Sequence, residues 1–240
     1  MISHRRYLAL LAALFGALWV ALAIHPLYRQ DWALENALVA VLVIAVAASH
    51  RRLLLSRLSY TMIFLFLCVH EVGAHYTYAE VPYDRWIEAL TGRSLNEMMG
   101  WQRNHFDRFA HFMYGFLMAY PLREVFLRVA EARGFWGYFM PFDVLLSSSA
   151  IFELFEWGAA EVFGGDLGVA YLGTQGDPWD AQRDMAWAGT GALVAMLIIA
   201  AIHARLKRDF AREMRESLRV KSKLPLGEDE DEIARLRALE

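Results

Sequence analysis

The sequence predicts an all-α fold, a polytopic membrane protein with a six-transmembrane-helix bundle and both termini cytoplasmic. The first reason is composition: 57% of the 240 residues are hydrophobic and the mean hydropathy is +0.26, more than a soluble domain of this length requires. The second is that the hydrophobic residues form six runs, most of them close to the roughly 20 residues that a helix needs to cross hydrocarbon. The third is that most basic residues flank these runs on one side.

The predicted spans are, in chain order, about Tyr7–Ile24, Trp32–Ala48, Leu58–Tyr78, Phe106–Tyr120, Phe139–Ala160 and Met185–His203. The first follows Arg5 and Arg6 as a signal peptide would, but no clean A-x-A site with small flanking residues precedes His25 and Pro26, so we expect an uncleaved anchor. The fourth and fifth are less hydrophobic because they carry acids and histidines. The single cysteine, Cys68, lies in the third span.

The orientation follows from arginine and lysine, which favour cytoplasmic loops. Basic residues precede the first span, follow the second, the fourth and the sixth, and are fewer in two of the three remaining loops. The middle outer loop, Ala79–His105, carries three arginines, and we expect it to form either a short interfacial helix or a packed cap. Residues 164–179 predict an irregular loop. We expect an integral domain over residues 1–204 and a cytoplasmic tail over 205–240.

Eight ionisable residues inside or beside the spans fall toward the outer side. They form four pairs at helical spacing: Glu71 and His75, Asp107 and His111, Glu153 and Glu156, Asp180 and Asp184. Residues three or four apart share a helix face, and ionisable groups within a membrane usually have a partner or a function. The pattern therefore predicts a site near the outer face.

A divalent metal is one cofactor that such pairs can bind, because helical bundles hold metals with paired ligands from facing helices. None of the pairs has the Glu-x-x-His spacing of the best-known bundles, and His70, Glu71 and His75 do not form an H-E-x-x-H motif. The predicted ligands are Glu71, His75, Asp107, His111, Glu153 and Glu156. The competing interpretation is a structural ion-pair network in which Arg103 and Arg108 neutralise Asp107 and part of the acidic set.

Serines 147–149 and the glycines Gly115, Gly189 and Gly191 predict close helix packing. We expect contact with membrane lipids and no nucleic-acid binding, since the basic residues flank apolar spans instead of forming one solvated face.

Four stretches carry a resemblance: HEVGAHYTY at 70–78, RNHFDRFAHF at 103–112, ELFEW at 153–157 and YLGTQGDPWDAQRDM at 171–185. Over about residues 5–205 the chain resembles the YjdF-like family of bacterial inner-membrane proteins, which implies a multi-pass inner-membrane location and no particular chemistry. The pattern D-x-x-x-H-F, E-x-x-E and D-x-x-x-x-G-x-G is more distantly similar to VanZ-like proteins, which are associated with glycopeptide resistance. The chain departs from them at Glu156, where a Gln often stands, and at Ala188, where an Asn often stands.

Two classes of function fit these observations. In the first, the protein is an enzyme acting on a lipid or lipid-linked envelope molecule at the outer leaflet. Its predicted catalytic residues are His75, Asp107, His111, Glu153 and Glu156, and the residues at its entrance are His70, Asp177, Asp180 and Asp184. In the second, it is a transporter or a lipid- or drug-binding module. A polar pathway to the cytoplasmic face would favour transport, and a dead-end pocket would favour an enzyme or binder.

Overall fold

The computed structural model describes residues 2–163, 174–206, 209–221 and 238. Within them the chain is helical and has no strand. The helices are α1 (His4–Leu22), α2 (Arg29–Ser49), α3 (Arg57–His75), α4 (Tyr83–Thr91), α5 (Leu95–Met99), α6 (Phe106–Val129), α7 (Trp136–Phe163), α9 (Asp180–Leu206) and α10 (Phe210–Ser217). Of the residues expected to form the loop 164–179, positions 164–173 lie outside the described part, as does most of the expected tail.

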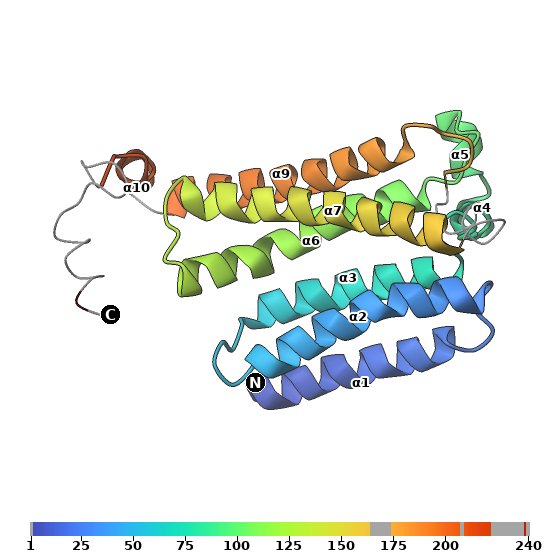
Figure 1. Cartoon of the computed structure of the whole chain (residues 1–240), viewed down its shortest axis with the longest axis horizontal. Coiled ribbons are helices and arrows are strands. Elements are labelled where there is room, and N and C mark those ends of the chain that lie inside the picture. The colour runs from blue at the N-terminus through green and yellow to red at the C-terminus, as the bar shows by residue number, and fades with distance from the viewer. Residues whose placement is uncertain (1, 164–173, 207–208, 222–237, 239–240) are drawn as a thin grey trace.

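The long helices form two layers that run side by side (Figure 1). One layer holds α1, α2 and α3, and the other holds α6, α7 and α9. Contact between α3 and α6 joins the layers, while α6 packs most extensively on α9. The short helices α4 and α5 lie at one end of the bundle, and α10 lies at the other (Figure 1).

Five of these helices are long and apolar enough to cross a membrane: α1, α2, α3, α7 and α9. Large apolar side chains cover their outer faces, including Val41, Ile44 and Leu197, each more than half exposed, and such a surface is expected where lipid replaces water. The all-helical, membrane-spanning class is therefore confirmed. The remaining long helix, α6, is continuous and runs beside them, but charged residues interrupt its apolar sequence.

Most helix boundaries differ by a few residues from the predicted spans, and three of these differences affect the polar end or the length of a helix. Helix α3 ends at His75 instead of Tyr78, because Thr77 and Tyr78 adopt φ of 54° and 53° and turn the chain back. Helix α6 continues through Pro121 to Val129, and α9 begins at Asp180. Hydropathy marks where apolar residues stop, and a helix can continue into polar sequence, so the spans and the helices need not share ends.

Two glycines let α6 and α9 approach closely. A Cβ on Gly115 would overlap the backbone carbonyl of Ala188, and a Cβ on Gly191 would overlap that of Phe112. Small residues at such crossings allow backbone contact within membranes. The predicted close-packing role of these two positions is confirmed, and the close approach sets the geometry of the polar residues that the two helices carry.

The segment between α3 and α6 folds over the polar end of the bundle. Asp84 accepts hydrogen bonds from the Ser94 hydroxyl at 2.8 Å and from the Asn96 backbone N–H at 2.9 Å, which joins α4 to α5. The Asn104 side chain donates to the Val81 carbonyl at 2.8 Å and ties the segment to the start of α6. This arrangement positions the residues that precede Asp107.

Candidate functional site

His111, on α6, is at the centre of the polar residues that converge from three helices. It is buried, and its Nε2 lies 3.6 Å from an Asp107 oxygen and 3.3 Å from a Glu153 oxygen. Its Nδ1 lies 3.4 Å from the hydroxyl of Ser149. Asp107 comes from the preceding turn of α6, whereas Glu153 and Ser149 come from α7. Both ring nitrogens therefore face groups that can orient the imidazole.

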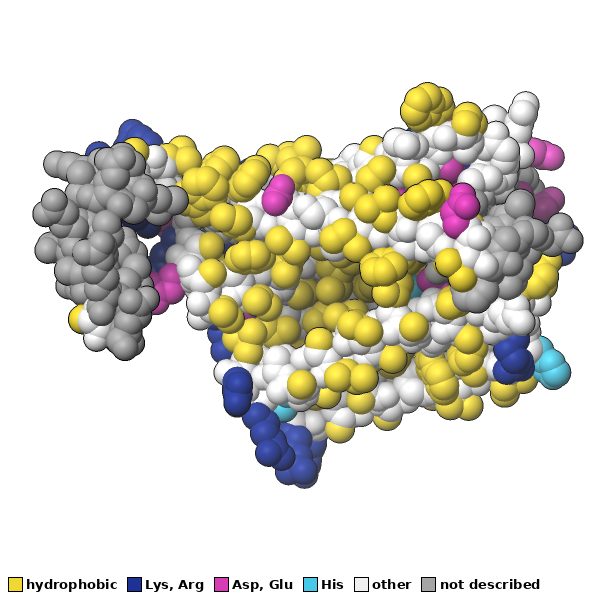
Figure 2. Space-filling view, viewed as in Figure 1, with side chains coloured by type: hydrophobic (Ala, Val, Ile, Leu, Met, Phe, Trp, Pro, Cys, Tyr) yellow, Lys and Arg dark blue, Asp and Glu magenta, His cyan; other side chains and the backbone are white. Residues whose placement is uncertain are grey.

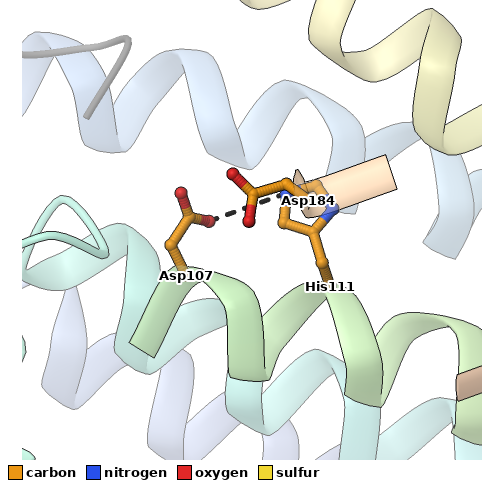
Figure 3. Close-up of side chains that lie close together, drawn as sticks. All are labelled: Asp107, His111 and Asp184. Carbon is orange, nitrogen blue, oxygen red and sulfur yellow. Dashed lines mark ion pairs between the residues drawn. The ribbon is translucent and has the colours of Figure 1, made fainter. Parts of the chain in front are cut away.

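Asp184 brings a third carboxylate to this group from α9. One ligand atom each from Asp107, His111 and Asp184 lie within 4.8 Å of one another. Figure 3 shows the three side chains, with the Asp107–His111 ion pair marked. Asp184 is 2% exposed. The i,i+4 pair on α6 thus meets the first turns of α9, which the early start of that helix makes possible.

A separate network of ion pairs lies beside this group. Asp180 accepts from Arg103 at 2.6 Å and from Arg108 at 3.3 Å. Asp177 accepts from Arg108 at 2.6 Å and also pairs with Arg103 and Arg183. The two arginines therefore neutralise part of the acidic set, as expected, because they pair with Asp180, but among the described residues their ion pairs are with Asp177 and Asp180 and not with Asp107.

Two ionisable groups in the loops at this end of the bundle, Asp177 and His105, have shifted pKa values. Burial opposes ionisation of Asp177, but the Trp179 backbone N–H and the nearby guanidinium groups outweigh it and lower the pKa of Asp177. Burial and the charges of Arg108 and Arg103 lower the pKa of His105. At neutral pH Asp177 is therefore ionised, while His105 is uncharged.

A second polar group lies between α2 and α3, facing the first. The Tyr78 hydroxyl is 2.7 Å from Nδ1 of His70, and the other ring nitrogen of His70 lies 4.0 Å from a Glu35 oxygen. Asp31 and Glu71 are also buried here. Both carboxylate oxygens of Asp31 and both of Glu71 lack a hydrogen-bond partner among the described residues.

A cavity of about 360 Å³ separates the two layers and connects the two polar groups. Figure 2 shows it as a hollow walled by hydrophobic side chains. The polar side chains lining it are His70, Tyr78, Asp107, His111, Tyr114, Ser148 and Ser149. Its remaining lining is apolar and comes from α2, α3, α6 and α7. A second hollow of about 400 Å³, between α7 and α9, is lined by Glu153, Glu156, Asp180 and Asp184 among others.

The structure brings some of the predicted site residues together and separates others. Asp107, His111, Glu153 and Asp184 meet, and Glu156 shares the second hollow with Glu153 and Asp184. His70 lines the cavity, and Glu71 belongs to the α2–α3 group. His75 faces away, with its Nδ1 2.7 Å from the Leu22 carbonyl. The last turn of α3 thus uses His75 to hold the α1–α2 connection.

Sequence reasoning missed four residues of these groups: Ser149, Tyr78, Asp31 and Glu35. Asp31 and Glu35 have the same i,i+4 spacing as the pairs that were recognised and lie at the same end of the bundle, so a usable signal was present. Ser149 stands four residues before Glu153, which places both on one face of α7. Tyr78 had no such signal, because its position depends on the turn after α3.

The comparisons with known proteins agree with a membrane location. The family description "Predicted membrane protein (DUF2238)" matches residues 7–205. The chain is 38% identical over 183 residues, covering 76% of this chain and 83% of the relative, to the protein called Inner membrane protein YjdF of Escherichia coli (strain K12). No solved structure matches.

These findings confirm the resemblance to the YjdF-like family and the predicted inner-membrane, multi-pass location. They do not show the more distant likeness to VanZ-like proteins. The matched region contains all the residues that meet around His111 and all the long helices except the first three residues of α1 and the last residue of α9. The chain belongs to the DUF2238 family of predicted membrane proteins.

Proposed function

We propose that the protein is an enzyme that acts on a lipid or lipid-linked envelope molecule, with its polar headgroup held at His111. One observation carries the proposal: an apolar cavity of about 360 Å³ has His111 and Asp107 in its wall. Binding sites for small molecules are mostly apolar, with a few polar groups placed to fix orientation. An amphiphile with a hydrocarbon chain and a polar head has the matching chemistry.

The exposed residues at the edge of the cavity support entry from the membrane. Leu38 on α2 and Ile151 and Phe155 on α7 line the cavity and are 38%, 52% and 64% exposed. These apolar side chains belong to helices that have the length and composition to cross the membrane. A substrate chain would pass between α2 and α7 without leaving hydrocarbon.

The proposed topology has six spans, with α6 as the additional one, and places both termini in the cytoplasm. Its support is that α6 lies alongside its neighbours and that the visible Lys and Arg side chains gather mainly at the end of the bundle near the N-terminus (Figures 1 and 2). With that end cytoplasmic, the group around His111 lies toward the outer face. Residues 1–204 form the membrane domain in this proposal, and 205–240 form the tail.

The proposed chemistry is general base catalysis by His111. Its Nε2 would accept a proton from a water or a substrate hydroxyl, while Asp107 and Glu153 would stabilise the imidazolium that forms. Ser149, near Nδ1, would fix the ring orientation. Glu156 would act through Glu153, and the ion pairs of Asp177 and Asp180 would hold α6 and α9 in register.

The alternative functions receive unequal support. A carrier needs a polar route across the membrane, but among the described residues the cavity beyond Tyr114 and Ser148 is bordered by Val39, Leu42 and Met118. This dead end disfavours transport. A module that binds a lipid or a drug without reacting uses the same cavity, so the experiment must separate binding from catalysis.

The test is the identity of the lipid that copurifies with the full-length protein. Lipids extracted from wild type, Leu42→Trp and His111→Asn would be identified by mass spectrometry. Leu42→Trp fills the cavity and should lose the lipid, whereas Leu197→Trp, on the exposed face of α9, should keep it. An enzyme predicts that His111→Asn retains an unreacted precursor that wild type converts.

Two results would contradict the proposal. Equal lipid retention by Leu42→Trp and Leu197→Trp would show that the cavity is not the binding site. The same lipid in the same state on wild type and His111→Asn, with no conversion by wild type, would favour the binding module.

A further inference from the structure

The group around His111 has the ligand set and the charge of a cation site. We propose that Asp107, His111 and Asp184 bind a divalent metal ion, Zn²⁺ or Mn²⁺, with Glu153 available as a fourth ligand. As a catalytic metal it rests on the function proposed above, with His111 then serving as a ligand and the metal-activated water taking the place of the His111 general base, whereas metal binding itself rests on the geometry described here. The metal would supply an activated water at neutral pH.

The positions of the ligand atoms support a shared ion. The three atoms lie within 4.8 Å of one another, and ligands at the usual Zn–N and Zn–O distances of ~2.0–2.2 Å are roughly 3–4 Å apart. Small side-chain rotations would close that difference. The backbone needs no such movement, because the contacts of Gly115 and Gly191 already hold α6 against α9.

The balance of charge gives a second argument. Asp107, Glu153 and Asp184 place three carboxyl groups around one imidazole. The nearby guanidinium groups pair with Asp177 and Asp180. Like charges in a site of low dielectric repel strongly unless protons or a cation intervene, and a divalent ion would neutralise two of the three carboxylates at once.

An unpartnered buried oxygen provides an independent observation. Asp184 is 2% exposed, and its Oδ1 has no hydrogen-bond partner among the described residues. A buried carboxylate oxygen without a partner carries a large desolvation penalty. One ligand atom of Asp107 and one of His111 lie within 4.8 Å of an Asp184 carboxylate oxygen. A metal ion bound between the three side chains would give the buried Asp184 carboxylate a partner.

The types of ligand restrict the choice of metal. Imidazole with carboxylates suits Zn²⁺ and Mn²⁺, whereas Ca²⁺ prefers six to eight oxygen ligands. The set also differs from the one that spacing predicts. Asp184 becomes a ligand instead of an entrance residue, and Glu71, His75 and Glu156 take no part.

The experiment measures metal binding directly, without an activity assay. Full-length protein in detergent would be stripped with a chelator, dialysed and titrated with Zn²⁺ and, separately, Mn²⁺ by calorimetry, with metal content checked by elemental analysis. We expect one ion per chain for wild type. Asp184→Asn should bind about 100-fold more weakly or not at all, since even the partners that orient metal ligands contribute roughly 10–100-fold to affinity. Asp143→Asn removes an exposed carboxylate from α7 and should bind like wild type.

A spectroscopic measurement tests the histidine. Bound Mn²⁺ should show magnetic coupling to one imidazole nitrogen in pulsed electron paramagnetic resonance, and His111→Gln should lose that coupling. Circular dichroism and gel filtration would establish that each variant is folded. If His111→Gln does not fold, the Asp184→Asn titration decides the question.

Absence of saturable Zn²⁺ and Mn²⁺ binding to wild type would overturn the metal site, as would unchanged affinity in folded Asp184→Asn. The lipid proposal is distinguishable from it. Loss of lipid in Leu42→Trp together with no metal binding would support the lipid enzyme and contradict the metal site. Metal binding without any bound lipid would support the metal site and contradict the lipid enzyme.

Discussion

The imidazole of His111 has carboxylates beside one nitrogen and a hydroxyl beside the other, an arrangement that can serve either catalysis or stability. In the catalytic case, Asp107 stabilises the imidazolium that forms when His111 takes up a proton. In the structural case, each group mainly offsets the burial of the other. The two cases give opposite results when both residues are changed together.

The first prediction concerns that pair. His111→Asn should lower turnover of the copurified lipid by about 10²–10⁴-fold, the range expected for loss of a general base, and Asp107→Asn should be nearly as severe. The double variant should stay inactive. Conversion of the extracted lipid by purified protein is the measurement.

A structural role would instead lower the thermal stability of both single variants and restore stability and activity in the double variant, since the neutral pair carries no desolvation penalty. Recovered turnover in the double variant would therefore contradict a catalytic role for this pair.

The second prediction concerns Asp177. Its pKa lies below its ordinary value of 3.8 because the Trp179 N–H and the arginines favour the carboxylate. A carboxyl group whose pKa is lower in the folded state stabilises the fold at pH values above its pKa in the unfolded state. This contribution is lost as the pH falls through its pKa in the folded state. At pH 7, Asp177→Asn should therefore have a lower Tm than wild type, and the difference should vanish only in acid below 3.8.

Thermal unfolding in detergent at a series of pH values is the measurement, with Glu88→Gln, an exposed change on α4, as the control. A difference that disappears near neutral pH would show that another group is responsible.

At the scale of elements, the α6–α9 contact supports the third prediction. Gly115→Ala would push the new methyl into the Ala188 carbonyl, and overpacking of a tight contact costs about 1–3 kcal/mol. Gly16→Ala, on α1, has no atom within 4 Å of its new Cβ and should be neutral or stabilising through helix propensity. Thermal unfolding of both variants is the comparison, and equal stability would mean that α6 and α9 can separate without penalty.

Each long helix is predictable because its length and hydropathy are properties of one continuous segment of sequence. The ends are less predictable, as α6 and α3 demonstrate. The helix of α6 extends past Pro121, and α3 stops before Thr77 because two consecutive residues turn with positive φ. Nothing in the hydropathy of residues 76–78 indicates that turn, which brings Tyr78 to His70.

At the scale of the whole molecule, the fourth prediction concerns topology. In a Cys68→Ser background, Arg93→Cys lies between α4 and α5, and Arg52→Cys lies between α2 and α3. A membrane-impermeant maleimide should label Arg93→Cys in intact spheroplasts and Arg52→Cys only after the membrane is broken. The reverse pattern would place the group around His111 on the cytoplasmic side.

The gathering of polar side chains at one end of the bundle is predictable from sequence, whereas the set of residues that meet is not. Helical spacing identifies Asp107 with His111 because both are on one helix. The inclusion of Asp184 and the exclusion of His75 depend on how α3, α6 and α9 are rotated about their axes. That rotation results from contacts between distant segments, such as Gly115 against Ala188, and no local pattern encodes it.

In the proposed function, entry of the lipid between α2 and α7 determines which concentration governs occupancy. A ligand that arrives through the side of the bundle is dissolved in the lipid bilayer. Its occupancy therefore depends on its mole fraction in the bilayer and not on its concentration in water. Detergent molecules are then competitors as well as solvent, because their tails fit the same lining of Leu38, Ile151 and Phe155. Affinities measured in micelles should therefore change with the ratio of detergent to protein, and nanodiscs of defined lipid composition provide the proper reference state.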